Sequence, residues 1–280
     1  MTTGVGIAGD WHGATPWALD CVRALPEDVR TLIHLGDFGL IGSGWDRYLF
    51  KVNREASRRD IDIKVVPGNH ENHDYIARQP LDGDGMIIAA ERVKLFPRGY
   101  RFTIEQVSFC AVGGAVSVDQ GHRTPFTSYW PAEELDDATV AQITNQGHAD
   151  VLLTHDAPLG ALPPTTMSNR ELVEWAGSEI ASKAYLHHRR VRALTDGLSP
   201  RLHLHGHFHV RHTQTVTWPG NDAQGYTCDI ESLACEGMEG NMVMLIIDDT
   251  STTVTPIPTP PAKTGTRVDT RTPIMREGTT

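Results

Sequence analysis

Short apolar runs alternate along the chain with longer segments in which apolar residues recur on one side only. The runs are rich in Val, Ile and Leu and are bounded by glycine, proline or polar residues, as is typical of buried strands. They occupy residues 5–9, 31–35, 63–66, 151–154 and 201–205. We therefore predict five short strands that are buried in the fold.

Three other segments have the three-to-four-residue spacing of an amphipathic helix. The first follows Thr15 and Pro16, which we expect to form the cap and the first turn. The second begins near Ser43, and the third spans residues 169–194 and leads into the last of the five strands. Strands that alternate with helices in this way predict a layered α/β fold.

Two further regions are richer in strand patterns than in helix patterns. Residues 86–118 hold several β-like runs with short breaks, which predicts that part of the architecture is antiparallel. The apolar run at residues 242–247 and the Thr-rich segment after it predict a closing hairpin. Because Thr, Pro and charged residues dominate from there to the end, we expect one domain over residues 1–257 and a flexible tail over residues 258–280.

The composition narrows the class of protein. Of the 280 residues, 39% are hydrophobic, which is enough for a substantial core, and the formal net charge of −10 argues against passive wrapping of long duplex nucleic acid. The chain does not open with a basic segment followed by an apolar stretch, and its longest apolar run is far too short to span a bilayer. The four cysteines form no C-x-x-C pair, which favours a reducing compartment. We therefore expect a cytoplasmic protein that does not associate with membranes.

Residue types that bind metal ions follow each of the five predicted strands. The carboxyl ends of strands in an α/β sheet meet at a common crevice, so these residues can converge although they are far apart in the sequence. A carboxylate can bridge two cations, imidazole supplies neutral nitrogen ligands, and glycine lets the backbone approach closely. A set of this size suits two ions better than one. The residues are Asp10 to His12, Gly36 and Asp37, Gly68 to Glu71, His155 and Asp156, and Gly206 to His209.

The order of these blocks resembles the motif of the calcineurin-like metallophosphoesterases, D-x-H, G-D, G-N-H-[ED], H and G-H-x-H. In this chain they read DWH, GD, GNHE, THD and GHFH, over residues 10–209. The resemblance is to bacterial and phage members, and it implies a four-layer α-β-β-α sandwich of two mixed sheets. It also implies two divalent transition-metal ions, with Mn as the first choice and Fe, Zn, Co or Ni as alternatives.

The resemblance assigns the metal ligands by position. One ion would be held by Asp10, His12, Asp37 and His209, and the other by Asp37, Asn69, His155 and His207. Asp37 would be the bridge. We expect His205 to orient the two histidines that follow it, and His203 and His212 to be ordinary core or surface residues.

The same resemblance implies hydrolysis of phosphate mono- or diesters by a hydroxide that bridges the two metals. His70 matches the family's histidine that contacts the phosphoryl group and protonates the leaving oxygen. The segment 121–134 is dense in Arg, His and aromatic residues and precedes a helix that we expect to be capped at residues 128–131. Within it, Arg123 is a candidate for a bidentate phosphate contact, although an arginine in a loop is more often a solvated or ion-paired surface group. Trp11 either stacks on a substrate base or packs in the interior.

Other interpretations of the function stay open at this point. The serine/threonine phosphatase branch of the family carries Asp-Arg-Gly shortly after Gly-Asp, which this chain lacks, so a phosphoprotein substrate is disfavoured. A nuclease or DNA-repair phosphodiesterase is the first alternative, and a non-catalytic binding scaffold of the same fold is the second. We expect a small phosphate ester or nucleotide as substrate, with long duplex nucleic acid disfavoured. The natural substrate, the preference for monoesters or diesters and the oligomeric state are not determined by the sequence.

Overall fold

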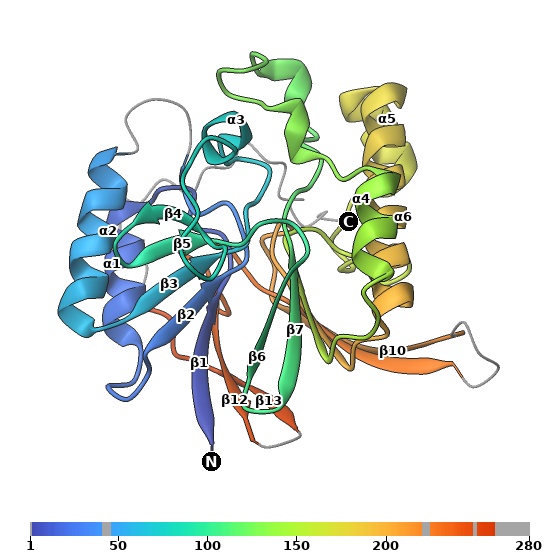
Figure 1. Cartoon of the computed structure of the whole chain (residues 1–280). Helices are drawn as coiled ribbons and strands as arrows, with labels where there is room; N and C mark the ends of the chain where they lie inside the picture. Colours follow the sequence, from blue (N-terminus) through green and yellow to red (C-terminus); the bar gives the residue numbers. More distant parts are fainter. Residues whose placement is uncertain (1, 41–45, 220–224, 249–250, 261–280) are drawn as a thin grey trace, which may run out of the picture.

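The computed structural model describes residues 2–40, 46–219, 225–248 and 251–260, and the strands in these ranges form two sheets (Figure 1). The first sheet has seven strands and the second has six. Across the first sheet the order is β13 (Thr252–Pro256), β12 (Met242–Ile247), β1 (Thr3–Ala8), β2 (Thr31–His34), β3 (Asp62–Val65), β5 (Val93–Leu95) and β4 (Ile87–Ala90). Across the second it is β10 (His212–Trp218), β11 (Tyr226–Ser232), β9 (Leu202–His205), β8 (Val151–Thr154), β7 (Val107–Val112) and β6 (Tyr100–Ile104).

Each sheet has a parallel centre and antiparallel edges. β1, β2, β3 and β5 pair in parallel, whereas β12, β13 and β4 join antiparallel. In the second sheet β7, β8, β9 and β11 pair in parallel, with β6 and β10 antiparallel at the edges. Both predictions of antiparallel structure are confirmed, namely the β-rich middle of the chain and the closing hairpin of β12 and β13.

Helices cover the outer face of each sheet (Figure 1). α1 (Thr15–Ala24) and α2 (Asp46–Arg59) pack on the first sheet, and α4 (Asp137–Thr144) and α6 (Ser178–Leu198) pack on the second. The remaining helices are α3 (His73–Ile76), α5 (Asn169–Ala176) and the 3-10 turns η1 (Gln120–His122) and η2 (Pro131–Glu133). Among the described residues no helix is both long and apolar enough to cross a membrane.

The alternation of side chains along the strands produces the layers. On β2, Leu32 joins the apolar cluster beneath α1 and α2, whereas its neighbour Ile33 joins the cluster between the two sheets. Phe109 and Leu153 meet that same central cluster from the second sheet, while Leu152 turns outward toward α4 and α6. Because successive residues of a strand point to opposite faces, each central strand is buried on both sides. The fold is the α-β-β-α sandwich that the resemblance implied.

Several predicted boundaries need correction. Thr15 is the first helical residue of α1, and the residue before it, Ala14, occupies the cap position without a side-chain hydrogen bond. The predicted start of the second helix near Ser43 lies outside the described residues. The third predicted helix is two helices, because Gly177, with a φ of 90°, ends α5 before α6 begins.

The helix expected after the segment 121–134 also begins differently. Pro131 starts only the short 3-10 turn η2, and α4 is capped by Asp136, whose carboxylate accepts a hydrogen bond from the backbone N–H of Thr139 at 2.6 Å. Asp136 provides the cap because it has the extended backbone that a cap residue needs. The domain boundary at residue 257 stays a prediction, and residues 261–280 of the expected tail lie outside the described residues.

Candidate metal centre

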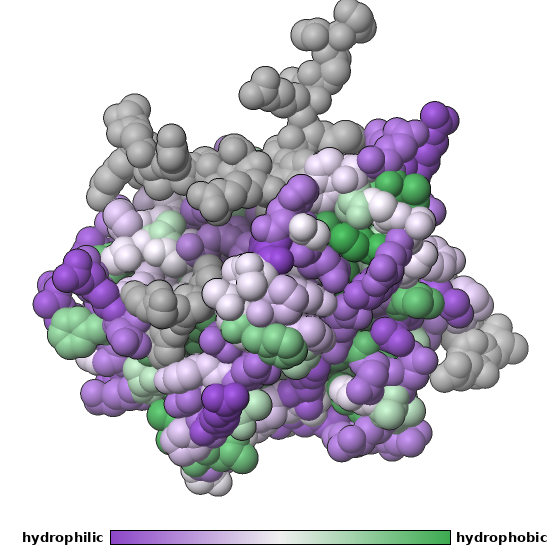
Figure 2. Space-filling model, turned by 90° about the horizontal axis from the view of Figure 1, so that it is seen from above, coloured by the Kyte–Doolittle hydropathy of each residue, from purple (hydrophilic) through white to green (hydrophobic). Residues whose placement is uncertain are grey.

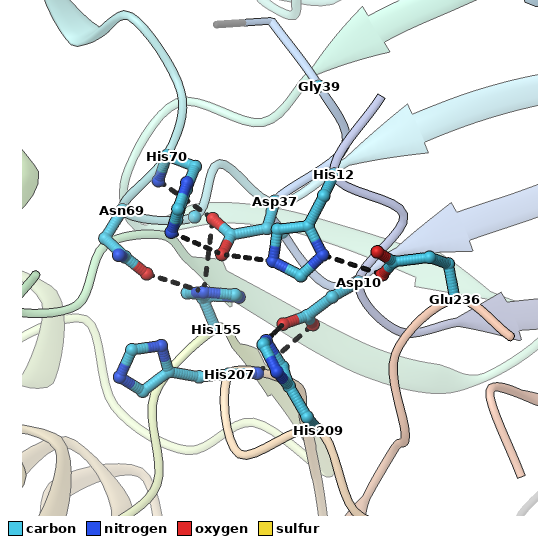
Figure 3. Close-up of polar contacts among 12 residues, drawn as sticks. Asp10, His12, Asp37, Gly39, Asn69, His70, His155, His207, His209 and Glu236 are labelled. Carbon is cyan, nitrogen blue, oxygen red and sulfur yellow. Dashed lines mark hydrogen bonds and ion pairs between the residues drawn. The ribbon is translucent and has the colours of Figure 1, made fainter. Parts of the chain in front are cut away.

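The predicted metal ligands meet at the carboxyl ends of five strands (Figure 3). β1, β2 and β3 contribute from the first sheet, and β8 and β9 contribute from the second. The two sheets face each other, so these strand ends border one space. The residues brought together are Asp10, His12, Asp37, Asn69, His70, His155, His207 and His209.

Four of the site residues have a left-handed backbone. The φ angles are 42° at His12, 54° at Asp37, 68° at His207 and 57° at His209. This conformation is uncommon outside glycine, although Asp and His adopt it more often than most residues. Such strain concentrates where the surrounding structure fixes side chains for a function. The turns at the strand ends therefore aim these four side chains into the site.

Glycines beside the ligands leave no room for a side chain. A Cβ at position 68 would lie 2.3 Å from Asp37 Oδ1, and one at position 206 would lie 2.3 Å from Asp10 Oδ1. Gly36, with a φ of 104°, would place a Cβ 2.2 Å from His155 Nδ1. These glycines allow the close backbone approach that we expected from their place in the motif.

The first group of converging ligand atoms comes from Asp10, His12 and His209. His209 Nε2 lies 3.1 Å from Asp10 Oδ2, and His12 Nε2 lies 3.4 Å from Asp37 Oδ2. The rings of His12 and His209 are 4.8 Å apart between their centroids. This group faces one oxygen of Asp37.

The second group is formed by Asp37, His155 and His207. His155 Nε2 lies 3.4 Å from Asp37 Oδ1 and 3.0 Å from the amide oxygen of Asn69. The Nδ1 atom of the same ring is 2.6 Å from the carbonyl oxygen of Leu35, which fixes the orientation of the ring. Asp37 thus presents Oδ2 to the first group and Oδ1 to the second, as a bridging ligand must.

The donor atoms fit a pair of cations. Asp10 is fully buried, and the imidazole nitrogen Nε2 of His209 lies 3.1 Å from its Oδ2. A buried carboxylate is costly unless positive charge neutralises it, and a cation held between Asp10 and His209 would supply that charge. The mixed set of carboxylate, amide and imidazole donors suits first-row transition metals, and the donor types alone do not select one of them.

The pKa values keep the carboxylates charged. Burial acts to raise the pKa of Asp10, but a hydrogen bond from His209 and the charges of His155 and His209 outweigh it and lower the pKa to about 2. Burial is likewise outweighed at Asp37, where the neighbouring imidazoles hold the pKa well below its usual value. Burial also lowers the pKa of His207 to about 4, which keeps that ring neutral. Ionised carboxylates and a neutral imidazole are the protonation states that metal binding requires.

The pKa values of two other imidazoles are shifted upward. Although burial lowers it, contacts with Asp37 raise the pKa of His155 to about 10. The pKa of His12 is raised well above its usual value by Asp37 and Glu236, again against the effect of burial. Both rings are therefore protonated beside the carboxylates. A cation that binds to these rings would displace the protons.

Three buried residues to which the sequence assigned no role support the site. Glu236 is 2.7 Å from His12 Nδ1 (Figure 3). Glu71 accepts hydrogen bonds from the backbone N–H groups of three residues beside the ligands, Asp37, Gly39 and Gly68. Asn241 donates to the carbonyl oxygen of Asp10 and accepts from two indole N–H groups. The sequence offered a signal only for Glu71, which lies inside the GNHE block.

The structure also places the other histidines of β9 and the tryptophan of the first motif. His205 places Nδ1 3.0 Å from the carbonyl oxygen of Gly206, and its Nε2 has no hydrogen-bond partner among the described residues. Among the described residues no hydrogen bond joins its ring to either of the next two histidines, and its effect on their orientation stays a prediction. Trp11 is fully buried and packs edge-on against His34, so it belongs to the interior and cannot stack on a substrate. His203 is a core residue, as expected.

A small cleft opens onto the converging ligands. It is lined by Val118 and Asp119 together with five residues of the site, Asp37, Asn69, His70, His207 and His209. Figure 2 views the molecule from above, at the end where the strands carry the site. Hydrophilic side chains dominate there and hydrophobic ones form small separate areas.

His70 and Arg123 meet at this cleft. The backbone N–H of His70 donates to Asp37 Oδ1 at 2.8 Å, and its Nε2 lies 3.8 Å from Asp37 Oδ2. Arg123 Nη2 is 2.7 Å from His70 Nε2 and 2.7 Å from Asp119 Oδ2. Burial lowers the pKa of His70 to about 3, so the neutral ring accepts the hydrogen bond from the guanidinium. Arg123 is ion-paired, but it is also mostly buried against the site.

Comparisons with known proteins bear on the family and the fold of the chain. The family model for calcineurin-like phosphoesterases matches residues 4–211. A search of the curated proteins returned no match. One solved crystal structure has a TM-score of 0.53 and 13% sequence identity, covering 92% of this chain and 100% of that chain, which supports the fold.

Two structures from Thermus thermophilus are more distant. One covers 92% of this chain and 100% of that chain, with a TM-score of 0.47 and 11% identity. The other, a 5'-nucleotidase precursor, covers 94% of this chain and 56% of that chain, with a TM-score of 0.45 and 10% identity.

Proposed function

The chain belongs to the calcineurin-like phosphoesterase family, and we propose that it hydrolyses small phosphate mono- or diesters with two divalent transition-metal cations. The observation that carries the proposal is the position of Asp37. Its Oδ2 lies beside His12, a member of the Asp10–His12–His209 group, and its Oδ1 lies beside His155, which joins it in the group with His207. A shared carboxylate between two ligand groups is the arrangement of a two-metal hydrolytic site.

The proposed ligand sets are those that the motif implies, and the two converging groups of ligand atoms support them. Asp10, His12, Asp37 and His209 would hold one cation, and Asp37, Asn69, His155 and His207 would hold the other. Bound cations supply a more acidic water and neutralise charge on the phosphoryl oxygens. We propose Mn first, and we keep Fe, Zn, Co and Ni as alternatives because all of these metals accept imidazole and carboxylate.

His70 is the proposed general acid. Its imidazole lines the cleft beside Asp37, within reach of a group that enters there. In the present arrangement Nε2 accepts a hydrogen bond from Arg123, so it cannot donate. When Arg123 turns to the phosphoryl group, Nε2 loses this donor and can take up a proton from solvent, which it then passes to the leaving oxygen.

Arg123 is the proposed substrate ligand. Its guanidinium is held at the cleft by Asp119 and by the carbonyl oxygen of Ser128, 3.3 Å away. A planar guanidinium with several N–H donors matches two oxygens of a phosphoryl group. Asp119 would keep the guanidinium oriented between turnovers.

The substrate and the compartment are proposed from charge and redox state. A net charge of −10 disfavours binding to long duplex nucleic acid and favours small phosphate esters or nucleotides. The four cysteines are free and buried, in accord with a reducing cytoplasm.

The test is hydrolysis of p-nitrophenyl phosphate and of bis-p-nitrophenyl phosphate with added Mn²⁺, then after chelation, and again after Mn²⁺ is restored. We expect activity that disappears on chelation and returns with the metal. Asp37→Asn should be inactive, because it weakens both ligand groups at once. A protein that binds less than one transition ion under metal-replete conditions, or that hydrolyses neither ester with any of the five metals, refutes the proposal.

His70→Ala tests the general acid separately. We expect the variant to keep two bound metal ions, measured by elemental analysis, and to lose about 10²- to 10⁴-fold in kcat. A kcat that remains close to that of the wild type would remove His70 from the mechanism and leave the metal site intact.

A further inference from the structure

The segment between β11 and β12 passes beside the metal ligands. β11 belongs to the second sheet and β12 to the first, so residues 233–241 cross from one sheet to the other at the end that carries the site. Glu236 lies in this segment and is 3% exposed. One of its carboxylate oxygens, Oε2, is 2.7 Å from His12 Nδ1 (Figure 3).

This contact determines which ring nitrogen of His12 can bind a cation. When Nδ1–H donates to the carboxylate, the other nitrogen, Nε2, carries the lone pair. Nε2 is the atom that faces Asp37 Oδ2, at 3.4 Å. A carboxylate that accepts from a metal-binding histidine fixes the ring orientation and makes the ring a stronger ligand. Glu236 therefore fixes His12 from the side away from the ligands.

The other ligand group has a weaker support of the same kind. His155 Nδ1 faces the carbonyl oxygen of Leu35, a neutral group, at 2.6 Å. The group around His12 includes Asp10 and has Glu236 behind it, whereas the group around His155 has the neutral amide of Asn69. Among the ligands and the groups hydrogen-bonded to them, Asp10 and Glu236 thus put two carboxylates on the His12 side. The buried carboxylate next to His155, that of Asp156, is paired instead with His187 and His188.

From this asymmetry we infer that Glu236 is a positioning residue that makes the Asp10–His12–His209 group the tighter of the two cation sites. The inference rests on the proposed function, since it requires that both cations bind. It concerns one residue that contacts no substrate, and it predicts two unequal affinities.

The experiment is a titration of the metal-free protein with Mn²⁺. Calorimetry and electron paramagnetic resonance monitor the binding of the ions. The wild type should bind two ions in resolved steps. Glu236→Ala should weaken the tighter step by about 10- to 100-fold and change the weaker step by less than about 3-fold, and weakening of the weaker step alone would overturn the inference. Glu236→Gln keeps the shape of the side chain and a neutral acceptor, so its loss should be intermediate.

Glu239→Gln is the matched control, because Glu239 is an exposed glutamate in the same segment. Its two affinities should equal those of the wild type. Thermal unfolding of each metal-free variant shows whether the segment still folds, and Glu236→Gln keeps the test valid if Glu236→Ala does not fold.

The outcomes separate the two claims. If the wild type binds no pair of ions, the proposed function fails together with the inference. If the wild type binds two ions and the folded Glu236 variants bind both with unchanged affinity, only the inference is overturned. Equal weakening of both steps also overturns it, because the effect would then be a general loss of structure.

Discussion

At the scale of single residues, Gly68 packs so closely against the proposed bridging ligand Asp37 that a side chain at position 68 would displace it. A side chain at this position would meet Asp37 Oδ1 at 2.3 Å and the backbone nitrogen of Asp37 at 2.4 Å. A rigid backbone atom cannot give way as the end of a flexible side chain can. The position therefore tolerates only glycine for steric reasons, although its φ is not in the left-handed region.

Gly68→Ala should lower the free energy of unfolding by about 1–3 kcal/mol and weaken metal binding, because Asp37 must move. Chemical denaturation and elemental analysis measure the two effects. Gly83→Ala is the control, since no atom lies within 4 Å of the added Cβ, and it should change neither quantity. A Gly68→Ala protein with normal stability and two bound ions would show that the site accommodates the methyl group.

Arg123→Ala addresses the residue that the sequence left between two interpretations. Removal of the guanidinium should raise KM about 10- to 100-fold, as expected for the loss of a charge-assisted hydrogen bond to phosphate. Steady-state kinetics on the better of the two nitrophenyl esters provides the measurement. Arg190→Ala, which removes only a surface pair with Asp137, should behave as the wild type. Unchanged KM and kcat for Arg123→Ala would assign the residue to structure alone.

At the scale of elements, α1 and α2 are joined by a charged contact that the sequence pattern did not indicate. Arg23 on α1 donates from Nε and Nη2 to the two carboxylate oxygens of Glu55 on α2, each at 3.0 Å. The carboxylate is 5% exposed, whereas the arginine side chain is nearly half exposed to solvent. The pair therefore contributes a modest amount to stability.

Glu55→Gln should lower the free energy of unfolding by about 1 kcal/mol at pH 7 and leave kcat unchanged. The hydrogen bond from Arg23 lowers the pKa of Glu55 below its usual 4.5, so the contribution is present above pH 4.5 and disappears as the pH falls further. Urea denaturation of both proteins at pH 7 and near pH 3 should show the difference shrinking at the lower pH. Glu27→Gln, an exposed control, should show no such dependence.

The helices also show where local pattern is insufficient. The apolar periodicity over residues 169–194 continues across Gly177. The helix nevertheless ends there, because the glycine adopts a φ of 90°. The segment 121–134 carries aromatic and basic residues that suggest a site, and its contact with His70 depends on how the second sheet places it. Apolar spacing predicts that a helix exists, but its ends depend on single backbone angles and caps.

At the scale of the whole molecule, the proposed cations would join the two sheets. Asp10, His12, Asp37 and Asn69 follow strands of the first sheet, and His155, His207 and His209 follow strands of the second. A cation bound by both sets stabilises the folded state over the unfolded chain, in which the ligands are far apart.

Removal of metal should therefore lower Tm by several degrees. Saturation at about 100 times the dissociation constant contributes about 2.7 kcal/mol, which corresponds to roughly 5–10 °C for a domain of this size. Calorimetric melting before and after chelation, and after Mn²⁺ is restored, provides the measurement. Asp37→Asn should lose most of the response. A Tm that is the same with and without metal would argue against a site that bridges the sheets.

The sequence by itself predicted the five strands that lead into the site, the alternation of helices with them and, through the motif, the residues that converge there. It could do so because side-chain periodicity and strand-end chemistry are local properties of the chain. Only the tertiary structure decided that Glu236 contacts His12, that Asn241 donates to the carbonyl oxygen of Asp10 and that Arg123 reaches His70. The first two contacts join residues more than 200 positions apart and the third joins residues 53 positions apart. Their distances are set by how two sheets pack together, and no local pattern records that packing.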